Sequence, residues 1–219
     1  MSDGGFEVIT NAEVTTVNQS ADYITVQSSN GDSHHGRVGV ITVPMNVMNS
    51  VGFNPPLSPV KREAAEVKHA GGGSKVFFVV NSDSGPVMTL ARSADSALIG
   101  SFTYHCGQKQ SLLAGFSLEP DALDKTVEEW QAIFNDYLPD LQIIRTFGHP
   151  WGTDPLSQGS WCSYRPGTVA RFADDLPQTE GKLFFASGDH GDGWRGFMEG
   201  AIASGSQTAM DVLQALRRS

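Results

Sequence analysis

The fold is decided by the stretch Leu183-Phe-Phe-Ala-Ser-Gly-Asp-His-Gly-Asp-Gly-Trp-Arg-Gly-Phe-Met-Glu-Gly-Ala201. Its apolar beginning, residues 182–186, predicts a strand, because an unbroken aliphatic and aromatic run suits the interior of a sheet. A glycine-rich loop follows, and small and apolar residues then predict a helix from about Phe197 to Leu216. The stretch therefore predicts a strand, a loop and a helix in direct succession.

Within this stretch, Gly191-Asp-Gly-Trp-Arg-Gly196 matches the G-x-G-x-x-G pattern of dinucleotide-binding loops. That motif requires a second strand after the helix, with an acidic residue about 20 residues beyond the glycines. Here the predicted helix runs to Arg217 and the sequence stops at Ser219, so a strand–helix–strand unit is not completed. We therefore reject the match as a dinucleotide fingerprint.

The remaining sequence alternates between strand and helix patterns. The first forty residues predict short strands with a turn at Ser29-Asn-Gly-Asp32, and the apolar run 37–44 predicts a strand buried on both faces. Ser58-Pro59 predicts the start of a helix, which the glycines at 71–73 end. A second helix is predicted over 121–138. Further strands are predicted at residues 75–80, 87–90, 97–102 and 112–116.

Composition argues against several classes of protein. The formal net charge of −9 argues against nucleic acid as a partner, since phosphate binding needs clustered Lys and Arg. The densest basic run, Lys61-Arg62, is typical of a solvated helix face. No apolar run approaches the roughly 20 residues that cross a bilayer, so neither a signal peptide nor a membrane partner is expected. Cys106 and Cys162 lack zinc spacing and fit a reducing, cytoplasmic location.

Several blocks of the sequence keep the order in which they occur in the flavin amine oxidase family, the family of monoamine, polyamine and L-amino acid oxidases. The chain resembles only the C-terminal half of that family, from about Val8 to Leu216. The blocks that carry the resemblance are Val40-Ile-Thr-Val-Pro44, Phe53-Asn-Pro-Pro-Leu57, Lys61, Gly73-Ser-Lys75, Trp151-Gly-Thr-Asp-Pro155, Gly159-Ser-Trp161 and the tail from Phe185 to Gly205.

The resemblance implies an α/β (α+β mixed) fold. Incomplete segments of a Rossmann-like FAD-binding domain, 1–43 and 156–219, would flank a mixed-sheet substrate domain with helices at 44–155. The family's true G-x-G-x-x-G and its ribose-binding acid are not in this sequence. The expected partner is therefore an N-terminal FAD-binding chain or missing segment, whether this chain is a separately encoded subunit, a truncated chain or a processed fragment.

The resemblance also assigns roles to three side chains near the substrate. Lys75 stands where the family has a lysine that holds a water against flavin N5, which makes it the expected catalytic residue. Trp161 and Phe197 align with the two aromatic residues that flank the amine, and such a pair excludes water and orients the reacting C–H bond. Phe197 departs from the more common tyrosine, so the cage lacks one hydroxyl.

The expected cofactor is FAD, bound non-covalently. The position at which some family members attach flavin through a cysteine is Ser160 here, and Cys162 lies past the aromatic residue. No metal is expected, because His105, His149 and His190 lack metal-ligand spacing. The residues expected to contact the cofactor are Val14, Gly188, Asp189, Trp194, Gly196 and Met198.

The function implied is the oxidation of a C–N bond in a small amine, with hydride transfer to flavin N5, hydrolysis of the imine, and reoxidation by O2 with H2O2 release. An alternative is a non-catalytic assembly subunit or degenerate half-enzyme that retains the fold. Another is a different flavoprotein, such as a desaturase or porphyrinogen oxidase. The substrate amine is not specified by the sequence, and a homo-oligomer remains open.

Overall fold

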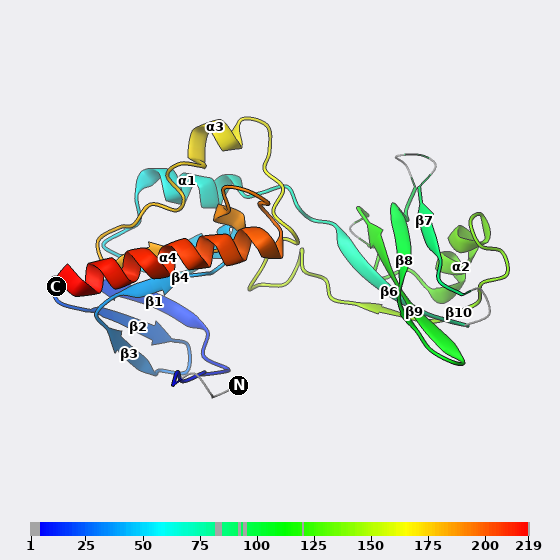
Figure 1. Cartoon of the computed structure of the whole chain (residues 1–219), viewed down its shortest axis with the longest axis horizontal. Helices are drawn as coiled ribbons and strands as arrows, with labels where there is room; N and C mark the ends of the chain where they lie inside the picture. The colour runs from blue at the N-terminus through cyan, green and yellow to red at the C-terminus, as the bar shows by residue number, and fades with distance from the viewer. Residues whose placement is uncertain (1–4, 82–84, 92, 94–95, 120, 219) are drawn as a thin grey trace. The chain divides into compact units, whose positions relative to one another are not determined.

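The computed structural model describes residues 5–81, 85–91, 93, 96–119 and 121–218, and the chain divides into two compact units (Figure 1). The first unit combines Met1–Ala70 with Cys162–Ser219, and the second unit is Gly71–Trp161. The sequence predicted boundaries after residues 43 and 155, whereas residues 44–70 pack in the first unit. The mixed α/β class is confirmed, because both units combine strands with helices.

The first unit contains a four-stranded sheet in the order β3-β2-β1-β5. Strand β1 pairs with β2 in antiparallel and with β5 in parallel register, and β2 pairs with β3 in antiparallel register. The turn predicted at 29–32 is present, with the amide of Ser28 donating to the carbonyl of Asp32 at 3.0 Å. These strands span Val14–Gln19 (β1), Ile24–Ser28 (β2), Ser33–Gly36 (β3) and Gly52–Asn54 (β5).

A separate two-stranded parallel sheet joins β4 (Gly39–Ile41) to β11 (Leu183–Phe185). The strand predicted at 182–186 is thus present as β11, and all three of its residues are buried. The prediction that β4 is buried on both faces is wrong for this chain, because Val40 is 45% exposed. Within the described residues, β4 pairs only with β11, so its other edge has no neighbouring strand to cover it.

Helix α1 (Pro59–Val67) begins where the sequence predicted, with the Ser58 hydroxyl accepting a hydrogen bond from the amide of Lys61. The expectation that Lys61 lies on a solvated face is wrong, since its side chain is only 2% exposed. The first unit also contains the 3-10 helices η1 (Met45–Ser50) and η2 (Gly188–His190) and the short helix α3 (Thr168–Phe172).

Helix α4 (Met198–Arg218) follows β11 and closes the first unit in sequence, close to the predicted bounds. On its side facing the unit, Gly200 and Thr208 are buried, and the Thr208 hydroxyl donates to the carbonyl of Phe185 at 3.1 Å. Its opposite side carries an exposed apolar stripe formed by Met198, Ile202, Met210 and Leu213. We call these four residues the α4 stripe.

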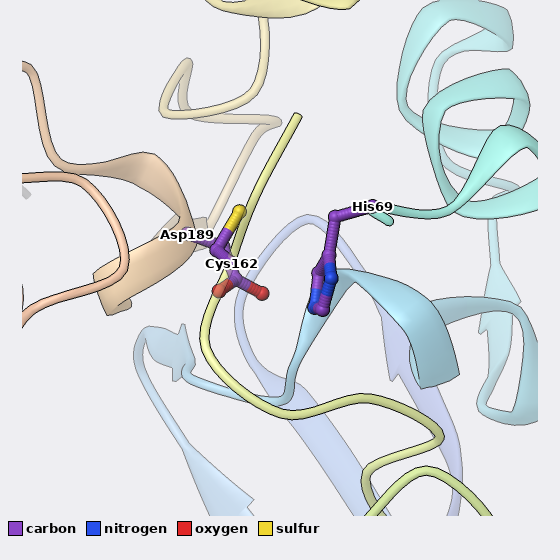
Figure 2. A group of neighbouring side chains, drawn as sticks. All are labelled: His69, Cys162 and Asp189. Atoms are coloured by element: carbon purple, nitrogen blue, oxygen red, sulfur yellow. The ribbon is translucent and has the colours of Figure 1, made fainter. Parts of the chain in front are cut away.

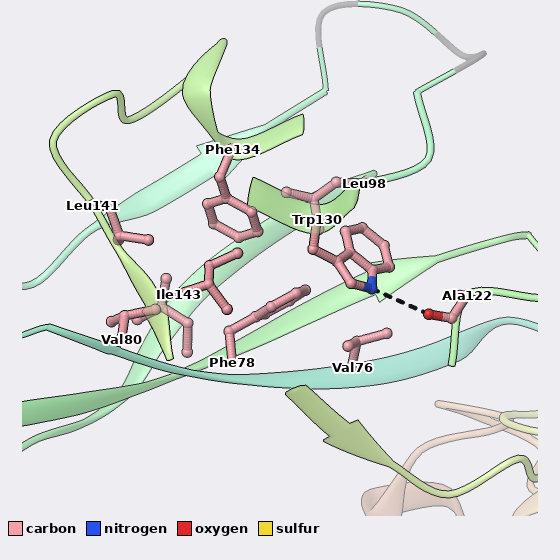
Figure 3. Close-up of a cluster of buried hydrophobic side chains, with 10 residues drawn as sticks. Val76, Phe78, Val80, Leu98, Ala122, Trp130, Phe134, Leu141 and Ile143 are labelled. Atoms are coloured by element: carbon pink, nitrogen blue, oxygen red, sulfur yellow. Dashed lines mark hydrogen bonds between the residues drawn. The ribbon is translucent and has the colours of Figure 1, made fainter. Parts of the chain in front are cut away.

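The second unit is a five-stranded antiparallel sheet in the order β10-β6-β9-β8-β7, with α2 (Val127–Asn135) packed on one face. Figure 3 shows the core between them, where Phe78 meets Trp130 and Phe134 edge-on and the Trp130 indole donates to the carbonyl of Ala122. Each of these buried aromatic side chains contributes about 2–3 kcal/mol through burial. The strands are Ser74–Asn81 (β6), Met88–Leu90 (β7), Gly100–Cys106 (β8), Gln110–Ser117 (β9) and Ile143–Gly148 (β10).

The bounds of α2 differ from the predicted helix over 121–138. A capping box formed by Thr126 and Glu129 starts the helix at Val127, so the preceding residues 121–124 form a turn. The helix ends at Asn135, three residues before the predicted end at 138. Its apolar side packs on the sheet, since Trp130 and Phe134 are both fully buried.

Candidate functional site

The loop between β11 and α4 gathers most of the residues predicted to contact the cofactor. Gly188 and Asp189 lie in η2, and the amide of Gly196 donates to the carbonyl of Gly188 at 2.9 Å, which folds the loop back on itself. Gly196 has a φ of 80°, and a Cβ there would lie 2.6 Å from the carbonyl oxygen of Cys162. Only glycine therefore fits at this position, and the loop conformation depends on it.

The same loop presents an aromatic surface outward. Trp194 is 70% exposed and Phe197 is 61% exposed, and their rings meet edge-on with centroids 5.9 Å apart. Helix α4 starts at Met198, immediately after Phe197, so the free amides of its first turn lie beside this surface. A helix start carries about half a positive charge, which favours a negatively charged group.

Two side chains of the same loop hold buried polar atoms that have no hydrogen-bond partner among the described residues. Within the described residues, neither ring nitrogen of His190 makes a hydrogen bond, and the same holds for Nε of Arg195. The Arg195 guanidinium lies over the ring of Tyr164, 4.6 Å from its centroid. Exposed rings, helix-start amides and unpaired donors together fit a flat, partly anionic group such as a flavin.

Burial lowers the pKa of His190 to about 4, from an ordinary value near 6.5. The charges of Lys61 and Arg195 lower this pKa further, and the charge of Asp189 opposes the shift. Between pH 6.5 and 4 the unfolded chain therefore binds a proton that the folded chain does not. Stability falls as the pH falls through this range, by about 3 kcal/mol from this group.

We expect the loss of folding stability between pH 7 and pH 4 to be smaller in a His190→Phe variant, because phenylalanine keeps a ring but does not titrate. The free energy of unfolding, measured by urea denaturation at pH 7 and pH 4, gives the comparison. A His34→Phe variant is the matched control, because His34 is exposed on β3. Equal losses in the wild type and in His190→Phe would show that His190 is not the source of the effect.

Val14 lies apart from this loop, on β1. It lines an apolar cavity of about 200 Å³ together with residues of β2, β4 and β5. Its side chain is half-buried, and the role predicted for it concerns only its backbone. The structure therefore places Val14 in the first unit without bringing it to the residues of the β11–α4 loop.

Lys75 and Trp161, the other residues predicted near the substrate, belong to the second unit, where they lie at the face of the sheet opposite α2, here called its outer face. Lys75 on β6 lies directly opposite Phe116 on β9, and its Nζ is 5.6 Å from the centroid of that ring. Trp161 meets Phe116 edge-on, with centroids 6.1 Å apart. Lys75 and Trp161 thus share one aromatic neighbour, while Phe197 belongs to the first unit.

An apolar hollow of about 270 Å³ lies on this outer face beside Phe116 and Trp161. Its floor includes Gly100, where a Cβ would come within 2.8 Å of the carbonyl oxygen of Thr89. The hollow therefore depends on a residue without a side chain at that point. The apolar side chains that line it are Met88, Leu90, Ile99, Phe102, Phe116 and Trp161.

Two features of the first unit were missed by the sequence analysis. One is the burial of Lys61, whose ammonium donates to the carbonyls of Asp175 and Gln178 at 2.6 and 2.8 Å. The other is the approach of His69, Cys162 and Asp189. More than twenty residues separate each member of this trio from the next, so no spacing rule could have indicated it.

The sequence matches the family model for flavin containing amine oxidoreductase over residues 2–213. It is 35% identical to a pseudooxynicotine dehydrogenase from Pseudomonas sp. over 99% of this chain and 44% of that protein. It is 26% identical to a nicotine dehydrogenase from Pseudomonas putida, over 99% of this chain and 45% of that protein. The chain thus spans a little under half the length of these curated relatives.

Solved structures agree on the fold. Putrescine oxidase bound to putrescine superposes with a TM-score of 0.79 at 20% identity, covering 93% of this chain and 49% of that one. Cyclohexylamine oxidase from Brevibacterium oxydans gives a TM-score of 0.75, also at 20% identity, with coverages of 93% and 48%. Among the described residues of this chain, no helix is both long and apolar enough to cross a membrane.

Proposed function

Because the chain belongs to the flavin containing amine oxidoreductase family, we propose that it forms the C-terminal half of an FAD-dependent amine oxidase. The observation that carries this proposal is the family match over residues 2–213, almost the whole chain. The proposed partner is the N-terminal FAD-binding portion, which would carry the phosphate-binding loop that this sequence lacks. We call the combination of the two the reconstituted enzyme.

In the proposed reaction, a bound flavin supplies the two-electron oxidation of an amine C–N bond, the imine product is hydrolysed, and O2 is reduced to H2O2. The β11–α4 loop is the proposed flavin-facing element of this chain. The amides near Phe197 and Met198 would stabilise negative charge on the cofactor, because they lie at the positive end of α4. Gly188 and Gly196 are proposed cofactor contacts of this loop, and Gly196 is required for its fold because a Cβ there would meet the Cys162 carbonyl.

The other cofactor contacts are proposed from the resemblance and supported by position. Asp189 and Trp194 lie in or beside the same folded loop, where they would contact the ribityl chain and the edge of the ring system. Val14 would contact adenine through its backbone. FAD is proposed to bind non-covalently, because Ser160 occupies the position at which some family members carry a flavin-linked cysteine, and the Cys162 thiol is buried.

The outer face of the second unit is the proposed substrate wall. Lys75 is proposed to hold a water at the reacting edge of the flavin, and Trp161 and Phe197 to flank the amine. Six of the described residues that line the hollow beside Trp161 have apolar side chains, and none of the described lining residues is Arg, Lys, Asp or Glu. A substrate amine with an apolar body fits such a wall better than an amino acid, whose carboxylate would lose water without gaining a partner.

Reconstitution tests this proposal. The N-terminal portion of the pseudooxynicotine dehydrogenase would be co-expressed with this chain and, in a second experiment, fused to it. The alignment with that protein, at 35% identity, sets the residue at which the two are joined. The expected result is a yellow complex that releases H2O2 only when an amine is added. A stable complex without flavin or activity would instead support a non-catalytic assembly subunit.

The isolated chain should bind FAD weakly or not at all. The pyrophosphate and the adenosine of FAD are normally held by the G-x-G-x-x-G unit, and this sequence lacks that unit. The visible absorbance of the purified chain, dialysed against excess FAD and then against buffer, measures the bound fraction. Stoichiometric flavin in the chain alone would contradict this expectation, while the reconstituted enzyme serves as the positive control.

A further inference from the structure

Three side chains with metal-binding chemistry converge in the first unit. His69 follows α1, Cys162 begins the second segment of the unit, and Asp189 lies in η2 (Figure 2). One nitrogen of His69, the sulfur of Cys162 and one carboxylate oxygen of Asp189 all lie within 4.8 Å of one another. His69 is 4% exposed and Cys162 is 8% exposed, so this trio is a buried feature and not a chance cluster on the surface.

We propose that His69, Cys162 and Asp189 bind one divalent d-block cation of the zinc type. Imidazole, thiolate and carboxylate are the three ligand types that zinc takes in proteins, at about 2.0–2.3 Å. Tetrahedral binding at those lengths puts the donor atoms roughly 3.3–3.7 Å apart, so the trio needs to close by about 1 Å. Three protein ligands leave a fourth position for water or for an incoming group.

The backbone around the trio is already held in place. The amide of Met45 donates to one carboxylate oxygen of Asp189 at 2.8 Å, and the Tyr164 hydroxyl donates to its backbone carbonyl at 2.7 Å. The amide of His69 donates to the side-chain oxygen of Asn46 at 2.9 Å. The Met45 bond is of the kind that orients a ligand side chain in metal sites, and the other two hold the backbone of Asp189 and of His69.

The charges also suit a dication. A thiolate from Cys162 and a carboxylate from Asp189 would together balance the charge of Zn²⁺ in a buried setting, where an unbalanced charge is costly. Burial lowers the pKa of His69, which keeps its imidazole neutral and able to bind metal. Burial and the neighbouring Asp189 raise the pKa of the Cys162 thiol to about 12, and Arg195 opposes that rise only in part. Binding of the metal must therefore displace the thiol proton.

Asp189 is used in both proposals, but the metal site does not rest on the proposed function, because the three ligands belong to this chain and the test uses the chain without flavin. Its consequence would be structural. One ion would tie the end of α1, the segment that starts at Cys162 and the β11–α4 loop into a single unit. The position of the loop would then depend on metal as well as on its own hydrogen bonds.

Cobalt is the probe for the test, because a tetrahedral Co²⁺ site is coloured and a Co²⁺–thiolate bond adds a charge-transfer band. The full chain would be titrated with Co²⁺ after chelator treatment, and Zn²⁺ would then be added in competition. We expect one Co²⁺ per chain with a thiolate band, displaced by one Zn²⁺. The titration would be repeated in a Cys106→Ser protein, in which Cys162 is the sole thiol.

The variants separate this site from adventitious binding. Cys106→Ser should bind Zn²⁺ as tightly as the wild type, since Cys106 is exposed and lies in the second unit. Cys162→Ser and His69→Gln should each weaken Zn²⁺ binding by about 100-fold or more. Co²⁺ binding by folded Cys106→Ser protein without a thiolate band would overturn the proposal, and so would a Cys162→Ser protein that binds Zn²⁺ like the wild type. The Cys106→Ser spectrum decides the matter even where the other two variants fail to fold.

Discussion

In the reconstituted enzyme, a Lys75→Met substitution is expected to slow amine oxidation by about 100-fold or more. Lys75 lies on the outer face of the second unit, exposed and opposite Phe116, so its ammonium is available to hold a water. Methionine keeps the length and the apolar stem but removes all three hydrogen-bond donors. The loss should therefore reflect the missing donors and not a change in packing.

The measurement separates the two halves of the catalytic cycle. Anaerobic mixing with amine gives the rate of flavin reduction, and mixing the reduced enzyme with O2 gives the rate of reoxidation. A role at the reacting edge of the flavin predicts that at least one rate falls while bound flavin and thermal stability stay unchanged. Lys109→Met, an exposed lysine in the same unit, is the control. If the rates of flavin reduction and of reoxidation are both unchanged in Lys75→Met, Lys75 has no part in the reaction.

A Lys61→Met substitution is expected to destabilise the chain by about 3–5 kcal/mol. The Lys61 ammonium is almost completely buried, donates to two backbone carbonyls, and pairs with Glu180 at 3.5 Å. It also lies 4.3 Å from the centroid of the Phe185 ring. Removing it would leave the carbonyls and Glu180 without their cation, and burial of unpaired polar groups is costly.

The charge of Lys61 depends on its ion pair with Glu180. Burial lowers the pKa of its ammonium, and Glu180 opposes that shift. The charge is therefore retained only because its partners are in place. Urea denaturation of Lys61→Met and of Arg171→Met gives the comparison, since Arg171 pairs with Glu63 on the exposed surface of the same unit. Exposed pairs contribute about 0–1 kcal/mol, so similar losses in the two variants would contradict this account.

Local signals in the sequence were enough to predict much of the fold. Ser58-Pro59 and the apolar run 182–186 specify their own conformations, so the start of α1 and the strand β11 were predicted correctly. The end of α1 was not, because the helix stops at Val67 and not at the glycines 71–73. The start of α2 was misjudged, because the helical pattern continues upstream of the capping box at Thr126. Exposure of Val40 could not be foreseen, since a β-branched run shows a preference for a sheet but not how many strands flank it.

The candidate site was only partly predictable for a different reason. Residues of the β11–α4 loop are close in sequence, so their proximity followed from one motif. The contact of Lys75 with Phe116 depends on strand register, and the approach of His69 to Cys162 and Asp189 depends on tertiary packing. Register and packing are set by the whole core and not by any local pattern, so neither contact could be derived from spacing.

The α4 stripe has a consequence for the amount of this protein that a cell can hold. Four large apolar side chains exposed along one helix make a surface of the kind that chaperones and proteases recognise. Copies whose stripe stays uncovered should be degraded faster than copies whose stripe is covered. We therefore expect the steady-state level of the chain in cells to be lower when it is expressed alone than when it is co-expressed with the N-terminal portion, as immunoblots of the two cultures would measure.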